Sequence, residues 1–347
     1  MDRKKGIIAI GVLIVLIIVG IAGYMYYKRT PTYTFSLIKT AVEKHDWDTF
    51  SKHVDTENVI GTGYDAFMES ALETDEDMDD SVKGMVGGFV KMMKPGIVAS
   101  LNEEVKEWVK TGQSGTSTDS TDSKSNQKDK QAADKIKKNV GFEQSSYKGI
   151  TSTRQDGDFT IAVVTITDKE LGRDFTLDVK MRQLDDGTWQ IMTISNLKDY
   201  LIELDKAKKE KLAELNKPIQ EKIDKQVAVQ SVQSRIAASD PWGFSHSLLT
   251  TVAIKLDSDQ QIDKAEGYLY LKGDDGKQKR FPVSATIGAK TGDKMLQLRK
   301  DLNPFIGGEA QFVKADLSRY TQTLVITKLI YSDGSTLALK KSLDEDK

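Results

Sequence analysis

Residues 7–27 form an apolar run near the start of the chain, and they set the first limit on its architecture. The run contains no charged side chain, and residues 7–19 are almost wholly aliphatic. A helix rises about 1.5 Å per residue, so about 20 apolar residues cross a hydrocarbon core of about 30 Å. We therefore expect one transmembrane helix over residues 7–27, with the membrane as its partner.

The residues around this run predict its orientation. Tyrosines 24, 26 and 27 lie at its end, as is usual at a lipid–water boundary. Three basic residues precede the run and two follow it, namely Arg3, Lys4 and Lys5 before it and Lys28 and Arg29 after it. This favours an N-terminus inside a bacterial cytoplasmic membrane, with residues 1–29 as tail and anchor and the bulk of the chain extracytoplasmic. A cleaved signal peptide is the alternative, but the run is longer than usual and the candidate cleavage site, Gly20 to Ala22, lies within it.

Composition excludes several classes of function. The formal net charge is −2, and basic and acidic residues are interspersed, which does not indicate a nucleic-acid partner. Cysteine is absent, so disulfides, thiolate nucleophiles and cysteine metal sites are excluded.

Residues 30–204 predict an α+β domain with an antiparallel sheet. Helical periodicity covers 33–50, 65–72 and 82–109, with a break at Pro95. Residues 111–134 are polar and are expected to form a disordered insert. Alternating patterns then predict strands at 142–152, 159–167, 173–184 and 188–194.

Residues 205–239 predict a helical connector, which continues a charged helical stretch that starts at Leu197. Pro218 is expected to kink or divide it. The narrow apolar stripe favours a packed connector or spacer, and a coiled-coil seam is the alternative.

Residues 240–347 predict a β-sandwich. Short candidate strands lie at 248–256, 267–271, 280–287, 311–313, 323–331 and 335–339. Glycine-, proline- and aspartate-containing turn signals separate them, as is typical of such folds.

Candidate chemistry is sparse. The acidic run 73–80 begins like a calcium loop, but Asp80 replaces the expected glycine and Val86 the expected glutamate, so a solvated loop is favoured. His45 and His53 are eight residues apart with no apparent third ligand, which favours surface or capping roles. No motif of a hydrolase, nucleotide-binding or zinc enzyme appears. We predict no catalytic, cofactor-binding or metal-binding residue and no enzymatic activity.

Parts of the chain resemble known families. An uncharacterised family of bacterial membrane-anchored domains is resembled by residues 31–46, Val54, Asp55, Val59, 86–101, 186–191, Asn196 and Leu197. This resemblance covers 31–204, without the insert, and implies a cone-shaped α+β fold similar to ketosteroid isomerase and nuclear transport factor. Residues 241–341 resemble the immunoglobulin-like modules of bacterial surface proteins, on Phe244, 248–256, 262–267, 303–305 and 330–334.

These features predict a binding or scaffolding protein whose ligand is an envelope protein, a wall polymer or a small apolar molecule held in the cone. An isomerase or hydrolase is the first alternative, and a buried carboxylate–tyrosine pair lining a deep pocket would favour it. A transport accessory for apolar cargo is the second, and a continuous apolar groove would favour it. Fold alone grants no activity.

Overall fold

The computed structural model describes residues 23–74, 80–113, 145–238, 245–274, 276, 278–303 and 307–346. Its contacts divide the chain into two compact units, and the division within the long helix α7 (Leu197–Gln226) falls after Leu204. Each unit has its own antiparallel sheet. The α+β class with antiparallel sheets therefore agrees with the sequence prediction. The predicted insert at 111–134 lies outside the described residues from position 114, as do positions 75–79 of the acidic run.

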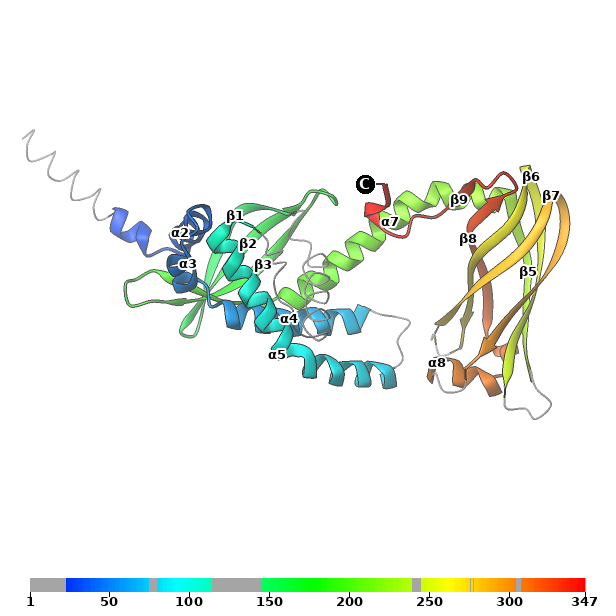
Figure 1. The fold of residues 1–347 in the computed structure, drawn as a ribbon, viewed down its shortest axis with the longest axis horizontal. Helices are drawn as coiled ribbons and strands as arrows, with labels where there is room; N and C mark the ends of the chain where they lie inside the picture. The colour runs from blue at the N-terminus through cyan, green and yellow to red at the C-terminus, as the bar shows by residue number, and fades with distance from the viewer. Residues whose placement is uncertain are drawn as a thin grey trace, which may run out of the picture. The chain divides into compact units, whose positions relative to one another are not determined.

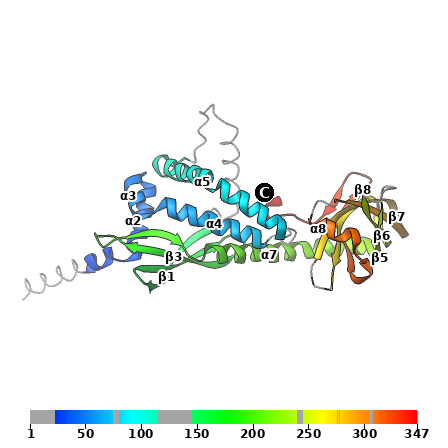
Figure 2. The same ribbon diagram turned by 90° about the horizontal axis from the view of Figure 1, so that it is seen from below.

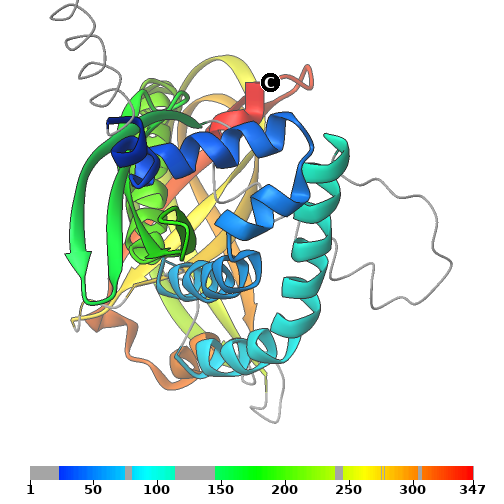
Figure 3. The same cartoon turned by 90° about the vertical axis from the view of Figure 1, so that its left-hand side faces the viewer.

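The first unit opens with helices that have clear local start signals. They are α2 (Pro31–Glu43), α3 (Trp47–His53), α4 (Thr56–Thr74) and α5 (Asp80–Thr111), of which α5 belongs to this unit from Gly87 onward. The Thr30 hydroxyl accepts the Tyr33 N–H at the start of α2, and the Asp46 carboxylate caps α3 in the same way. Pro95 does not divide α5, but Figure 3 shows the helix changing direction along its length, as expected where a proline removes a backbone donor.

Four strands follow in simple sequence order: β1 (Ser145–Asp156), β2 (Phe159–Asp168), β3 (Arg173–Gln183) and β4 (Trp189–Ile194). On β3 the alternating Phe175, Leu177, Val179 and Met181 are buried. The helices cover one face of this sheet, with α4 between α5 and the strands (Figure 2). Tyr64 of α4 packs against Ile97 and Leu101 of α5. The sequence predicted all four strands to within a few residues, because their alternation is regular.

The edge strand β4 is closed by the chain itself. The Asp55 backbone N–H donates to the Ile191 carbonyl at 2.9 Å, and the Asn58 side chain donates to the Met192 carbonyl at 2.7 Å. These bonds satisfy groups that a sheet edge would otherwise present to a second strand.

Helix α7 ends at Gln226, so the predicted helical connector does not reach residue 239. Pro218 lies within the continuous helix. The prediction of a coiled coil is wrong, because the apolar stripe packs on its own chain: Leu201 and Leu204 are buried in the first unit, and Ile223 joins the core of the second.

The second unit is built from β5 (Val227–Ala238), β6 (His246–Lys272), β7 (Gln278–Leu302), β8 (Thr321–Tyr331) and β9 (Thr336–Ala338). Short helical turns lie at Gly307–Ala310, Gln311–Lys314, Leu317–Arg319 and Leu343–Asp346. The strands form one sheet, in which β6 pairs with β5, β7 and β8 (Figure 1).

This sheet folds over on itself to make its own core. The two ends of β6 meet, since Leu248 shares a core cluster with Leu269 and Leu271. The fold-over lies at the register irregularity between Asp257 and Ile262. One layer therefore holds β5 with the first half of β6 and the second half of β7. The other holds the second half of β6, the first half of β7, β8 and β9.

This arrangement differs from the predicted immunoglobulin-like sandwich. The predicted strands 248–256 and 267–271 are two halves of one 27-residue strand. The predicted strand 311–313 is a 3₁₀ turn whose Phe312 packs edge-on against Phe281 at 5.5 Å. Local patterns separated the halves of β6 because the polar residues from Asp257 to Gln261 resemble a loop.

The predicted membrane helix is also corrected. In the part of the chain that the structure describes, no helix is long and apolar enough to cross a membrane, because the long helices α5 and α7 carry charges along their length. Residues 7–22 lie outside the described residues, and residues 23–28 are helical. The predicted single-pass anchor over 7–27 is therefore wrong, and so are the N-inside topology and the extracytoplasmic location that depended on it.

Candidate functional site

Two tyrosines of β6 stand on the outer face of the second unit. Strand alternation buries Leu269 and leaves Tyr268 and Tyr270 half-buried on the opposite face. Their ring centroids are 6.5 Å apart. In the described residues neither tyrosine hydroxyl has a hydrogen-bond partner. The pair thus offers two rings and two free hydroxyls to a ligand.

Strand β7 supplies a cation beside these rings. Its Arg280 pairs in register with Tyr270, and the guanidinium lies 5.0 Å from the ring centroid of Tyr268. This cation–π contact holds the arginine over the tyrosine face. Tyrosine and arginine are among the residue types that contribute most to protein–protein binding energy.

A glycine allows β8 to approach this face. A Cβ atom added to Gly267 would meet the Val325 carbonyl oxygen far inside van der Waals contact. Gly267 stands at the irregularity in the β6–β8 register, immediately before Tyr268. Its missing side chain therefore permits the strand pairing that positions the tyrosines.

The tyrosines and Arg280 line a cavity of about 890 Å³. Its charged lining residues are Glu266, Arg280, Arg299, Lys328, Lys340 and Lys341. The one carboxylate among them is already engaged, because Glu266 accepts a hydrogen bond from Lys264 at 2.7 Å. That bond and the neighbouring lysines lower the pKa of Glu266. The cavity is consequently basic.

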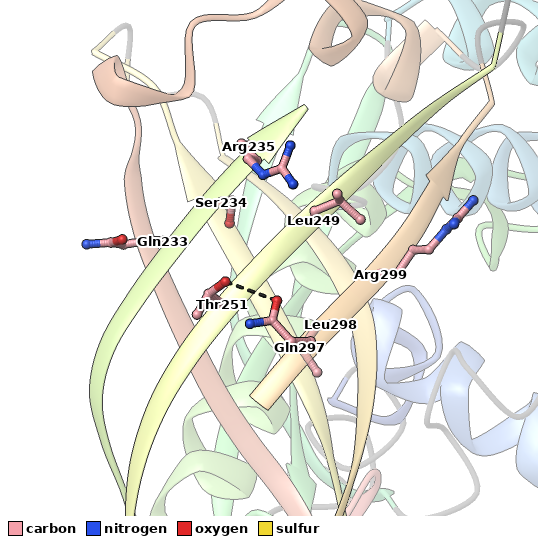
Figure 4. A pocket seen from close by; sticks show the side chains of 8 residues that line it. All are labelled: Gln233, Ser234, Arg235, Leu249, Thr251, Gln297, Leu298 and Arg299. Carbon is pink, nitrogen blue, oxygen red and sulfur yellow. Dashed lines mark hydrogen bonds between the residues drawn. The ribbon is translucent and has the colours of Figure 1, made fainter. Parts of the chain in front are cut away.

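A second cavity of about 550 Å³ lies on the other layer (Figure 4). Across β5, β6 and β7, one row consists of Arg235, Leu249 and Arg299, and the next of Gln233, Thr251 and Gln297. Thr251 donates to the Gln297 side chain at 3.1 Å. The Arg235 guanidinium makes no hydrogen bond or ion pair within the described chain.

The two cavities meet at β7, because Leu298 and Arg299 line both. The lining of the two cavities contains one carboxylate, that of Glu266, and six basic side chains: Arg235, Arg280, Arg299, Lys328, Lys340 and Lys341. We call this surface the basic groove. Anionic groups bind such a surface through charge-assisted hydrogen bonds to arginine and lysine.

The histidines singled out by the sequence serve separate structural roles. The His45 Nδ1 lies 3.0 Å from the Val109 carbonyl near the end of α5. His53 is buried, with Nδ1 2.8 Å from the Thr49 carbonyl and Nε2 3.2 Å from the Thr188 hydroxyl. Among the residues that the structure describes, no group of three or more metal-ligating side chains is placed to hold an ion.

The first unit contains a buried carboxylate and a buried tyrosine, Asp168 and Tyr200. The Asp168 Oδ1 accepts the backbone N–H groups of Glu170 and Leu171 at 2.9 and 2.8 Å, which closes the β2–β3 turn. Burial, with the negative charge of Asp168 nearby, raises the pKa of Tyr200 to about 12. These groups stabilise the fold, and neither lines the cavities described here.

A cavity of about 530 Å³ in the first unit is lined by Asp55, Glu57, Asn58, Gly61, Thr62, Lys94 and Met192. Two of its polar side chains are already used, since Asn58 bonds to β4 and Lys94 pairs with Asp65 at 2.6 Å. It offers a ligand fewer uncommitted groups than the basic groove.

Sequence reasoning missed the basic groove. The alternation Tyr268-x-Tyr270 within a predicted strand placed both rings on one face, which was the available signal. The basic side chains around the rings are brought together by the fold-over of β6 and β7, which local patterns do not encode.

Comparison of the chain with known protein families, curated proteins and solved structures found no match. The resemblances drawn from residues 31–204 and 241–341 therefore stay predictions, and the functional argument depends on the site itself.

Proposed function

We propose that this chain is a non-catalytic binding protein whose second unit holds an acidic segment of another protein in the basic groove. The observation that carries the proposal is the Tyr268–Tyr270–Arg280 cluster, which presents two rings and a stacked guanidinium inside the larger cavity. Protein interfaces concentrate their binding energy in such residues.

The charge of the groove favours an acidic partner over a neutral one. Six basic side chains line it against one carboxylate that lysine already pairs. Its lining mixes polar and apolar side chains, and the excess of basic groups favours an anionic partner over purely apolar cargo. The buried Asp168 and Tyr200 do not favour an enzyme, because the carboxylate is committed to turn N–H groups.

Fluorescence anisotropy of labelled polyglutamate, added to the full chain, tests the proposal. We expect saturable binding that weakens as salt is raised to about 0.5 M, since salt screens exposed charges. The double variant Tyr268→Ala with Arg280→Ala should weaken binding about tenfold or more, because it removes the ring pair and the cation together.

A matched control comes from the other sheet. Tyr147 and Arg182 are exposed residues of the first unit, and the double variant Tyr147→Ala with Arg182→Ala should bind polyglutamate like the unmodified chain. Absence of binding, or an equal loss in both double variants, would contradict a site in the groove.

A further inference from the structure

The second half of β7 has an open edge. Residues 293–299 pair with β6 on one side, from Asp293 opposite Lys255 to Arg299 opposite Leu249. On the other side, within the described chain, their backbone groups have no hydrogen-bond partner. We call residues 293–299 the free edge. Alternate N–H and C=O groups of such a strand point outward and can pair with an added strand.

The opposite side of the folded sheet is different. There β5 and β8 approach each other, and the Ser234 N–H donates to the Gln322 side chain at 2.7 Å. A side chain thus covers a backbone donor on β5. The free edge of β7 has no such cover among the described residues.

The free edge also lacks backbone features that discourage strand pairing. Pro282 and Gly288 lie in the first half of β7, whereas residues 293–299 contain neither proline nor glycine. Its basic residues have near neighbours: Lys294 donates to the Ile287 carbonyl, and Arg299 pairs with Asp301 at 2.9 Å. Met295 is 62% exposed.

The basic groove flanks this edge. The larger cavity is lined by Val283 and Leu298, which come from the two halves of β7, so the cavity reaches the side of the sheet where the edge is open. The smaller cavity ends at Arg299 on the same strand. A strand added to the free edge would therefore lie between both cavities.

The alternation of β7 sets the pattern of such a strand. Leu296 and Leu298 face the core, while Met295, Gln297 and Arg299 face outward. Successive side chains of an added strand continue the two faces, so apolar residues would extend the core and acidic ones would lie beside Arg299.

Building on the function proposed above, we infer that the partner binds by strand addition. An extended segment with alternating acidic and apolar residues pairs its backbone with residues 293–299 and places its carboxylates in the basic groove. This is one of the recurring modes of peptide recognition, in which main-chain bonds give affinity and side-chain pockets give specificity.

The test uses an eight-residue peptide of alternating glutamate and valine, capped at both ends and fluorescently labelled. Two companion peptides carry N-methyl groups, one on every glutamate and the other on every valine. Charge and side chains are retained, but each companion loses the backbone donors of one strand edge. Binding to the full chain is measured by fluorescence anisotropy.

Strand addition predicts that the unmodified peptide binds and that one companion binds about tenfold or more weakly than the other. Equal affinity of the three peptides would overturn strand addition but leave side-chain binding in the groove intact. Failure of both this peptide and polyglutamate would overturn the proposed function as well.

Two further arms separate other occupants. Sedimentation of the full chain should show a monomer, and a dimer that the peptide does not dissociate would mean that a second copy covers the edge. Dextran sulfate should not displace the peptide at equal charge concentration in about 0.5 M salt. Full displacement there would assign the groove to polyanions in general and overturn the strand-specific inference.

Discussion

The edge strands β4 and β7 show two ways of ending a sheet. Along β4, the Thr34 hydroxyl accepts the Trp189 N–H at 3.0 Å. The Asp55 backbone N–H and the Asn58 side chain donate to the next carbonyls, those of Ile191 and Met192. Residues 293–299 of β7 have no equivalent cover in the described structure. In the first unit helices pack on the sheet to form the core. In the second unit the sheet folds over and packs on itself.

This difference has a functional consequence. Helices cover one face of the first sheet, and the chain closes its β4 edge, so this edge offers a partner little backbone. A sheet that folds on itself keeps its outer faces and one edge accessible. The second unit is therefore the better candidate for binding, and the first for support.

The largest expected effect comes from Gly267→Ala, which tests the close strand approach of the second sheet. The added methyl collides with the Val325 carbonyl, so we expect about 3 kcal/mol of destabilisation, as for overpacked cores. Gly61→Ala is the matched control, because its helical site is open and alanine should stabilise it by up to about 1 kcal/mol. Urea unfolding measures both, and equal effects would contradict the contrast.

The covered sheet of the first unit should lose stability in alkali. Folding raises the pKa of Tyr200 from about 10 to about 12, so above pH 10 the unfolded chain releases a proton that the folded chain retains. Stability should thus fall by about 2–3 kcal/mol between pH 10 and 12. Tyr200→Phe should remove this decline in urea unfolding curves, and Tyr26→Phe, at an exposed site, should leave it. An unchanged decline in Tyr200→Phe would refute the assignment.

The Asn58→Leu variant removes part of the cover on the edge of β4. The variant removes the donor to the Met192 carbonyl and should cost about 1–2 kcal/mol, because a polar group loses its partner. The comparison variant is Asn102→Leu, whose amide bonds only within α5, and its effect should be smaller. Thermal unfolding monitored by circular dichroism reports both. The same loss in both variants would mean that covering β4 has no special role.

The smallest expected effect concerns the β3–β4 turn. Hydrogen bonds from Lys52 and Thr188 lower the pKa of Asp186, so its stabilising contribution is present above the ordinary value near 3.8 and is lost as pH falls below it. The pair with Lys52 is half-exposed, so Asp186→Asn should cost less than about 1 kcal/mol at pH 7. Asp185→Asn, beside it, should be neutral. A cost for Asp186→Asn that does not shrink between pH 4 and pH 2 would show that the ion pair is not its source.

Much of the first unit could be predicted from sequence. Regular alternation in residues 159–167 and 173–184 marks strands with one buried face, and each connects to its neighbour by a short turn. Breaks in the helices were predicted at Pro95 and Pro218, but both helices continue across the proline because they are packed on both sides of it. The closure of β4 by Asp55 and Asn58 joins residues more than a hundred positions apart, which no local pattern records.

The second unit could be predicted less well. The strand patterns of residues 248–256 and 267–271 were visible, but their union in β6 and its fold-over depend on pairing with β7 along most of its length. The basic groove was missed for the same reason: Arg235, Arg280 and Arg299 come from three separate strand segments. The sequence could place Tyr268 and Tyr270 on one face, but not the cations around them.

Residue-resolved amide hydrogen exchange of the free chain at neutral pH tests the central claim most directly. The open edge predicts that alternate amides in residues 293–299 exchange rapidly while their neighbours, which bond to β6, exchange slowly. On β4, the Trp189 amide should exchange slowly although it lies on the edge strand, because it donates to the Thr34 hydroxyl. Uniform slow exchange across 293–299 would mean that the edge is already covered, and it would contradict both the comparison of the two sheets and the strand-addition mechanism.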